Sequence, residues 1–118
     1  MALRIVQGCD AAYGIKKRAD YTAIVTGGID DYAAGKPIYL LDVWRDRIQL
    51  QDLPLHIEAQ FFKWAPEGCL YVTIENTLWN AALIQTLRRR GNVPLMEIDR
   101  RKKYNPDKKT RFEGLAFR

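Results

Sequence analysis

Two carboxylates that each follow an apolar run are the residues of this chain best suited to chemistry. Asp10 follows the run at residues 5–9, and Glu75 follows the run at residues 70–74. Carboxylates delivered side by side at strand ends repel each other unless a cation lies between them. Hard oxygen ligands favour Mg²⁺ or Mn²⁺ over Zn²⁺. The pair therefore predicts a divalent-metal site, whereas either acid alone would more simply be a solvated strand end.

Small residues surround the first of these acids. Gly8 precedes Asp10, and Ala11, Ala12 and Gly14 follow it. Little side-chain bulk lets a ligand or another backbone approach closely. We expect a ligand to dock beside Asp10.

Length and composition predict one globular domain spanning residues 1–118. The chain has 47% apolar and 28% charged residues, which is typical of a soluble globular protein and not of a disordered or membrane one. It has no apolar run long enough to cross a bilayer, and its first residues do not resemble a signal peptide. We therefore expect a cytoplasmic protein without a membrane partner. Cys9 and Cys69 lack zinc-site spacing and are predicted to be reduced core residues.

The net charge of +5 is concentrated in short basic clusters. The arginines at 88–90 precede Gly91, so they are explained structurally by a helix that ends there: glycine suits the C-cap, and basic side chains interact favourably with the negative end of the helix dipole. The clusters in predicted loops have no such explanation, and cationic loops near an acidic metal site suit a nucleic acid. The candidate nucleic-acid-binding residues are Lys16, Lys17, Arg18, Lys108, Lys109 and Arg111.

Hydrophobic periodicity predicts the element order βββαβαβ. Strands are expected at 4–10, 21–28 and 37–44, with Gly27 and Gly28 opening the hairpin that follows the second strand. A helix at 50–64, a strand at 70–75, a helix from Asn76 or Thr77 to Arg90 and a strand at 94–98 follow. In a mixed α/β sheet of this order, helices pack on the sheet and the first and fourth strands are parallel neighbours. This topology would place Asp10 and Glu75 at the same end of the sheet.

Four segments in this order resemble the C-terminal nuclease domain of tailed-phage terminase large subunits. They are Gln7-Gly8-Cys9-Asp10-Ala11-Ala12-Tyr13-Gly14, Asp20-Tyr21-Thr22-Ala23-Ile24-Val25, Val72-Thr73-Ile74-Glu75-Asn76 and Lys108-Lys109-Thr110-Arg111. The resemblance covers residues 4–112 and implies a ribonuclease H-like fold. It also implies an endonuclease that cuts concatemeric DNA during genome packaging and uses two Mg²⁺ or Mn²⁺ ions.

The same resemblance assigns roles to individual residues. Asp10 would bridge the metals and Glu75 would be the second ligand, both of them catalytic. Asp20 would be a supporting metal ligand, although it is equally well explained as a turn residue. Lys109 and Arg111 would contact substrate phosphate or stabilise the site. The family has a further aspartate downstream of the position where this chain ends, so we expect an incomplete domain that could dimerise to compensate.

Partners follow from the resemblance in the same way. Double-stranded DNA is the expected substrate, and a packaging ATPase domain, a small terminase subunit and a portal are expected partners in an infected or prophage-bearing host cell. The chain itself lacks a phosphate-binding loop, because Gly35-Lys36 is followed by Pro37. Two alternatives remain: a resolvase-like nuclease of the same fold, and a non-catalytic nucleic-acid-binding or assembly module.

Aromatic residues and the lone histidine are assigned mainly structural roles. Trp44, Trp64 and Trp79 are predicted to pack in the core. His56 is expected on the surface of a helix, away from both acids. Tyr13 lies beside Asp10 and could either stack on substrate or pack within its loop.

Overall fold

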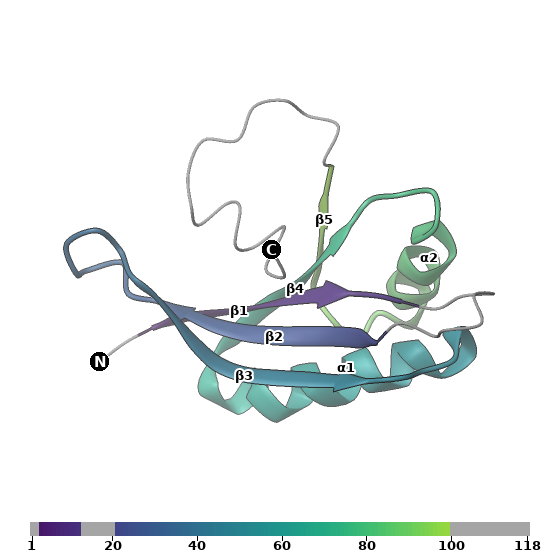
Figure 1. Cartoon of the computed structure of the whole chain (residues 1–118), viewed down its shortest axis with the longest axis horizontal. Helices are drawn as coiled ribbons and strands as arrows, with labels where there is room; N and C mark the ends of the chain where they lie inside the picture. Colours follow the sequence, from purple (N-terminus) through teal and green to yellow (C-terminus); the bar gives the residue numbers. More distant parts are fainter. Residues whose placement is uncertain (1–2, 13–20, 100–118) are drawn as a thin grey trace.

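The computed structural model describes residues 3–12 and 21–99 of the chain. Three strands come first: β1 (Arg4–Asp10), β2 (Thr22–Ile29) and β3 (Ile38–Asp46). The 3₁₀ turn η1 (Leu50–Asp52) leads into helix α1 (Leu53–Trp64), and the turn η2 (Ala65–Glu67) leads out of it. Strand β4 (Cys69–Glu75), helix α2 (Ala81–Arg90) and strand β5 (Leu95–Ile98) complete the described fold (Figure 1). The predicted order βββαβαβ is confirmed.

The five strands form one mixed sheet in the order β3-β2-β1-β4-β5. The first three strands are an antiparallel meander, whereas β4 is parallel to both β1 and β5. Helical crossovers explain this change of direction, because parallel neighbours need a long connection between them. The prediction of parallel, adjacent first and fourth strands is confirmed, and the strand order is consistent with a ribonuclease H-like fold.

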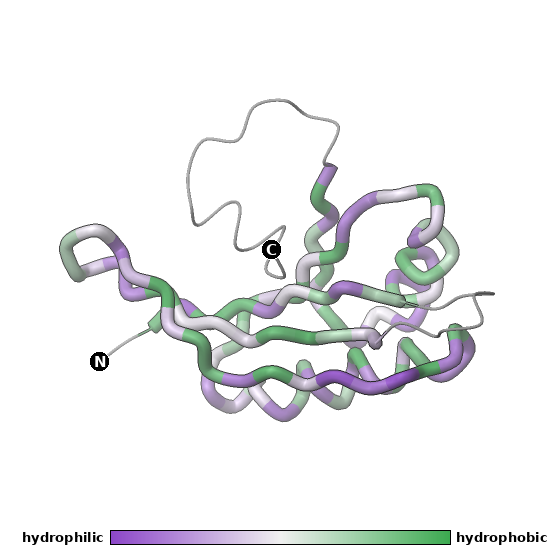
Figure 2. Tube along the Cα trace, viewed as in Figure 1, coloured by the Kyte–Doolittle hydropathy of each residue, from purple (hydrophilic) through white to green (hydrophobic). Residues whose placement is uncertain are grey.

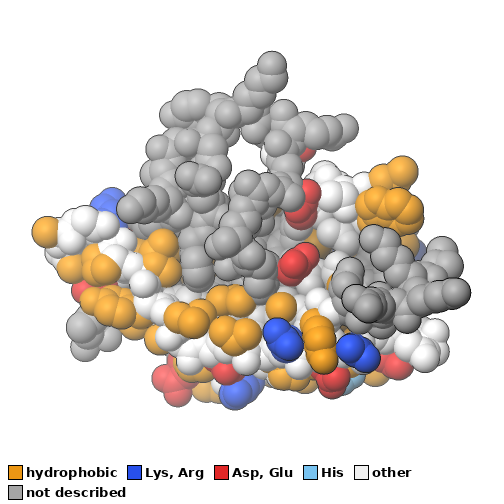
Figure 3. Space-filling view, viewed as in Figure 1, with side chains coloured by type: hydrophobic (Ala, Val, Ile, Leu, Met, Phe, Trp, Pro, Cys, Tyr) orange, Lys and Arg blue, Asp and Glu red, His pale blue; other side chains and the backbone are white. Residues whose placement is uncertain are grey.

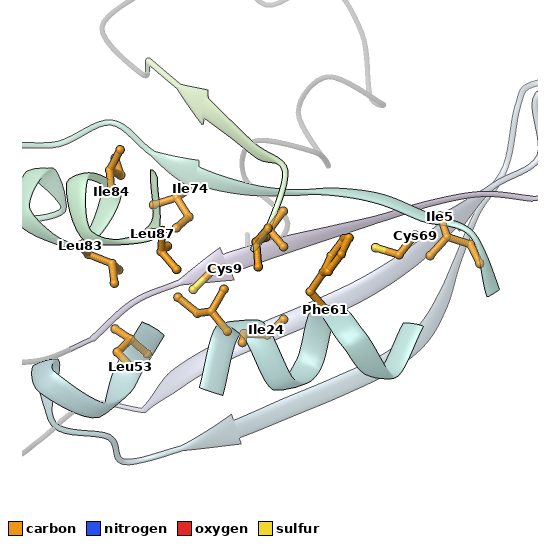
Figure 4. Close-up of a cluster of buried hydrophobic side chains, with 13 residues drawn as sticks. Ile5, Cys9, Ile24, Leu53, Phe61, Cys69, Ile74, Leu83, Ile84 and Leu87 are labelled. Atoms are coloured by element: carbon orange, nitrogen blue, oxygen red, sulfur yellow. The ribbon is translucent and has the colours of Figure 1, made fainter. Parts of the chain in front are cut away.

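The core lies between one face of the sheet and the two helices. Leu53, Ile57 and Phe61 of α1 and Leu83 and Leu87 of α2 are buried there. Figure 4 shows these helices directing apolar side chains toward Cys9, Ile24 and Ile74 on the strands. Along α1, hydrophobic and hydrophilic positions alternate as expected for a helix with one buried side (Figure 2).

Within residues 3–12 and 21–99, no helix is long and apolar enough to cross a membrane. Cys9 and Cys69 are buried and free, as predicted.

Strand β2 has the predicted length but is shifted by one residue, and Gly27 and Gly28 lie within the strand and do not open the hairpin. Gly28 allows the strand to pass close to its neighbours: a Cβ at this position would lie 2.8 Å from Leu3 Cδ1. The turn begins at Asp30, whose Oδ1 accepts hydrogen bonds from the backbone N–H groups of Tyr32 and Ala33. An aspartate that satisfies the backbone of its own turn is a stronger turn signal here than the glycine pair.

Helix α2 starts later than predicted. Thr77 does accept a hydrogen bond from the Asn80 backbone N–H, at 3.2 Å, but it forms a turn before the helix and does not cap it. The residue at the helix N-cap is Asn80. Trp79 therefore lies in the connecting loop, where 79% of it is exposed, so the prediction of core packing is wrong for this residue. Trp44 and Trp64 do pack against the core.

A buried amide connects β1 to two other elements. Gln7 is fully buried, and its Nε2 donates to Thr26 Oγ1 at 3.1 Å and to the Gln60 carbonyl at 3.0 Å. Thr26 is the residue paired with Gln7 across β1 and β2, and Gln60 lies on α1. The other side-chain atom, Gln7 Oε1, has no hydrogen-bond partner within the described part of the chain. Gln7 therefore joins three elements at the cost of one unsatisfied oxygen.

Candidate active site at the ends of β1 and β4

The two predicted metal ligands are the last residues of neighbouring parallel strands. Cys9 of β1 is in register with Ile74 of β4, so the next residue along each strand brings Asp10 beside Glu75. Neighbouring strands are about 4.8 Å apart. Both carboxylates can therefore reach one cation, or a pair of cations, at this end of the sheet.

Strand alternation places the acids on the sheet face opposite the helices. Cys9 and Ile74 direct their side chains into the core between sheet and helices. Because successive side chains of a strand point to opposite faces, Asp10 and Glu75 belong to the other face. Asp10 is exposed and Glu75 is half-buried. Figure 3 shows that acidic side chains reach the surface of the molecule on the face in view.

The chain around Asp10 is fixed by β2. Asp10 pairs with Ala23 in the antiparallel ladder. Two residues later, the Ala12 backbone N–H donates to Thr22 Oγ1 at 3.0 Å, and the Thr22 hydroxyl donates to the Ala12 carbonyl at 2.9 Å. Thr22 is fully buried, so this reciprocal pair holds the exit from β1 in place. Asp10 is thus held between a strand ladder and a side-chain clamp.

The loop after Glu75 is fixed in a comparable way. The buried Asn80 donates from Nδ2 to the Glu75 carbonyl at 2.9 Å, and the Thr77 backbone N–H donates to the same oxygen at 3.0 Å. The Asn76 backbone N–H donates to the Ile98 carbonyl on β5. Both acids therefore extend from a backbone that is hydrogen-bonded on each side, which favours a fixed ligand geometry.

The charge of Asp10 acts on its neighbour in the core. Burial, and secondarily the nearby negative charge of Asp10, raise the pKa of the Cys9 thiol to about 12. A thiol with this pKa stays protonated at neutral pH, and only thiolates bind metals or act as nucleophiles. Cys9 is therefore a packing residue, and the chemistry at this end of the sheet belongs to the carboxylates.

The described residues supply part of a metal site. Two hard carboxylate oxygen donors fit Mg²⁺ or Mn²⁺, which also retain several water ligands. Among residues 3–12 and 21–99, no group of three or more His, Cys, Asp and Glu side chains is placed to hold an ion. Asp20, the third predicted ligand, lies outside the described residues.

The predicted nucleic-acid contacts also fall largely outside the described part of the chain. Lys16, Lys17, Arg18, Lys108, Lys109 and Arg111 are not among the described residues, and neither is Tyr13. Two arginines of the described cluster at the end of α2 form ion pairs. Arg88 pairs with Glu97, and Arg90 pairs with Glu58 at 2.7 Å.

The lone histidine lies on the helix side of the sheet. His56 lies on α1 and stacks on Trp44, with ring centroids 5.3 Å apart. Trp44 packs toward the helices, whereas Asp10 and Glu75 belong to the other face of the sheet. The prediction that His56 lies away from both acids is confirmed, although stacking makes it half-buried and not a fully solvated surface residue.

One cationic group on the acidic face was missed by sequence reasoning. Arg45 and Arg47 contact the ring of Tyr21 at the end of the sheet that carries Asp10. Arg45 and Arg47 are two residues apart, a spacing that in a strand puts both side chains on one face, although Arg47 directly follows the end of β3. That spacing, together with the antiparallel pairing of the second and third strands, was the available signal.

The fold defines the class of the molecule: an α/β protein with a five-stranded mixed sheet, whose strand order is consistent with a ribonuclease H-like fold. The solved structures include a similar one, the large terminase from a thermophilic bacteriophage, with a TM-score of 0.58 and 14% sequence identity. The similarity covers 81% of this chain and 23% of the terminase chain. The chain therefore has a terminase-like fold over most of its length and spans less than a quarter of that protein. No protein-family model and no curated protein matches the sequence.

Proposed function

We propose that this domain is a divalent-metal-dependent endodeoxyribonuclease of the terminase type. The observation that carries the proposal is the parallel register of β1 and β4, which brings Asp10 and Glu75 together on one face at one end of the sheet. The terminase-like fold supports it. The proposed substrate is double-stranded DNA, and a packaging ATPase domain, a small terminase subunit and a portal are proposed partners.

In the proposed mechanism, the protein's task is to position charge. Asp10 and Glu75 would hold the metal ions, with Asp20 as a proposed supporting ligand. Bound divalent ions in such sites activate a water and stabilise the departing oxygen of a phosphodiester. The clamp at Thr22 and the loop at Asn80 keep the two carboxylates in place while the phosphate is bound. The only histidine of the sequence stacks on Trp44 on the helix side, so imidazole is not assigned a role as general base.

The test is cleavage of supercoiled and linear duplex DNA in Mn²⁺, Mg²⁺ or chelator. We expect metal-dependent cutting that falls by at least about a hundredfold in both Asp10→Asn and Glu75→Gln, because each change removes a charged metal ligand. Matched controls are Asp52→Asn and Glu67→Gln, which remove exposed carboxylates outside the site and should leave the rate unchanged.

Two results would count against the proposal. Cutting that persists in chelator, or that survives in both site variants, would show that the acids do not hold catalytic metals. DNA binding without cutting would instead support the alternative of a non-catalytic nucleic-acid-binding or assembly module.

A further inference from the structure

An aromatic ring with two guanidinium groups on it lies at the end of β2 and β3. Arg45 Cζ is 4.2 Å from the centroid of the Tyr21 ring, and Arg47 Cζ is 4.9 Å from it. All three side chains are exposed, Tyr21 by 43%. We call Tyr21, Arg45 and Arg47 the arginine–tyrosine platform.

The register of the sheet places this platform in the same row as the acids. Ala23 is paired with Asp10 on β1 and with Arg45 on β3. Cross-strand partners share a face of the sheet, so Arg45 belongs to the face of Asp10 and Glu75. Two strand spacings separate Asp10 from Arg45, which corresponds to about 10 Å. Figure 3 shows basic side chains on either side of a hydrophobic one on the face that also carries acidic side chains.

The arginines of the platform differ from those at the end of α2. Arg88 and Arg90 pair with Glu97 and Glu58. Among the described residues, neither Arg45 nor Arg47 forms an ion pair with a carboxylate. The exposed Asp46 between them accepts a hydrogen bond from the Arg47 backbone N–H and not from a guanidinium. Within the described residues, no carboxylate therefore competes for the guanidinium donors that an external anion would use.

A purely structural role does not explain the platform well. A cation–π contact at an exposed site contributes about 0.5–1 kcal/mol, and one arginine is enough to cover one side of the ring. Two like charges brought to one ring repel each other. A polyanion that lies across both guanidinium groups would offset this repulsion. A guanidinium group on an aromatic ring can still donate hydrogen bonds from its edge to phosphate oxygens.

We propose that the arginine–tyrosine platform binds the sugar-phosphate backbone of DNA and sets its position relative to Asp10 and Glu75. This inference rests on the proposed function for the class of ligand. DNA rises about 3.4 Å per base along each strand, so a contact about 10 Å from Asp10 falls a few nucleotides from the phosphate that is cut. Arg45 and Arg47 would act as positioning residues that grip a neighbouring phosphate, while the acids act on the scissile one.

The experiment measures binding of a short fluorescent duplex by the full chain in chelator, over a range of salt concentrations. The test variant is Arg45→Gln/Arg47→Gln. Its matched control is Lys36→Gln/Arg89→Gln, which removes the same charge from the β2–β3 turn and from the last turn of α2. Neither control residue forms an ion pair within the described part of the chain.

We expect the test variant to bind about tenfold more weakly at low salt and the control to bind nearly as the wild type does. The slope of log affinity against log salt should fall by about 0.9 for each phosphate contact that is lost. This slope is a readout that a merely structural role would not change. Circular dichroism of each variant establishes that the fold is intact.

Three results would overturn the inference: equal weakening in both double variants, no weakening in the test variant, or no duplex binding by the wild type. Because binding is measured without metal, its failure is distinct from failure of the nuclease proposal. A wild-type chain that binds through the platform but does not cut DNA would support this inference and refute the catalytic assignment.

Discussion

At the scale of single residues, Cys9 and Asp10 are neighbours on β1 whose side chains lie on opposite faces of the sheet. The Cys9 thiol lies in the core. Burial and then the charge of Asp10 raise the pKa of Cys9 to about 12, and burial raises that of Cys69 to about 11. Both thiols should therefore be inert in the folded protein.

Thiol labelling tests this expectation. At about pH 8, the native chain should react with a disulfide reagent far more slowly than a free cysteine does, whereas the unfolded chain should release two equivalents. Asp10→Asn should accelerate labelling only slightly, because burial is the larger cause of the raised pKa. Rapid labelling of the native wild type would contradict the buried positions of both cysteines.

The lowered pKa of Glu58 predicts that the stability of the fold depends on pH. Hydrogen bonds from Arg90, at 2.7 and 2.8 Å, are the largest cause that lowers the pKa of Glu58 below its ordinary 4.5. Burial acts in the opposite direction, and a hydrogen bond from Asn92 lowers the pKa further. A lowered pKa means that the unfolded chain binds the proton more readily. The stabilisation is therefore complete above about pH 5 and is lost as the pH falls through the pKa of the folded state.

Chemical denaturation of Glu58→Gln at several pH values checks this sign. At neutral pH the variant should be less stable by about 1–2 kcal/mol, since Arg90 is partly exposed. The difference from wild type should shrink as the pH falls below about 5, because the unfolded wild-type chain then binds a proton that the folded chain binds only at lower pH. The exposed Glu67→Gln should show no such trend; a constant deficit for Glu58→Gln would exclude the ionic explanation.

At the scale of elements, α1 is the principal cover of the sheet. Ile57 is fully buried in the core, whereas Leu55, on the same helix, is 56% exposed. Replacing Ile57 by Ala should lower the free energy of unfolding by about 2–5 kcal/mol, because the cavity adds to the lost burial. Leu55→Ala should change it by less than about 0.5 kcal/mol. Equal effects in urea denaturation would show that α1 does not bury the side described.

The elements could be predicted largely because their signals are local. Period-two and helical spacing located each described strand and both described helices, and the parallel placement of β1 beside β4 followed from their order. The start of α2 was missed because Thr77 and Asn80 both form short-range hydrogen bonds, and their residue types alone do not decide which of them is the N-cap. The place of Gly28 inside β2 could not be predicted, since it depends on a contact with Leu3, which is distant in sequence. The platform was missed for a similar reason: Tyr21 meets Arg45 and Arg47 only through the strand register.

At the scale of the whole molecule, β3 closes one side of the described sheet. It pairs with β2 and, within the described residues, with no other strand. Tyr39, Leu40 and Val43 of this strand are 44%, 65% and 50% exposed. A long edge strand with apolar side chains is prone to pair with another chain. We therefore expect weak self-association through β3, in keeping with the homodimer proposed from the sequence.

Light scattering over a range of concentrations tests this expectation. The mean mass of the wild type should rise with concentration, and Leu40→Lys should reduce the rise because charge on an edge strand opposes pairing. Leu78→Lys is a suitable control, since Leu78 is 90% exposed but lies in the loop before α2. A wild type that stays monomeric at high concentration would contradict self-association.

Gln7 affects the molecule beyond its own hydrogen bonds. If β1 slipped by one residue against β2, the Gln7 amide would move to the other face and lose both Thr26 and the Gln60 carbonyl. The native alignment leaves one amide oxygen unsatisfied among the described residues, whereas a slipped alignment would also lose both hydrogen bonds of the amide nitrogen. A purely apolar residue at this position would penalise such errors less. Gln7 lies three residues before Asp10 on the same strand. A register shift of β1 that displaced Asp10 would therefore also break the Gln7 hydrogen bonds, so the buried amide favours the alignment in which Asp10 lies beside Glu75.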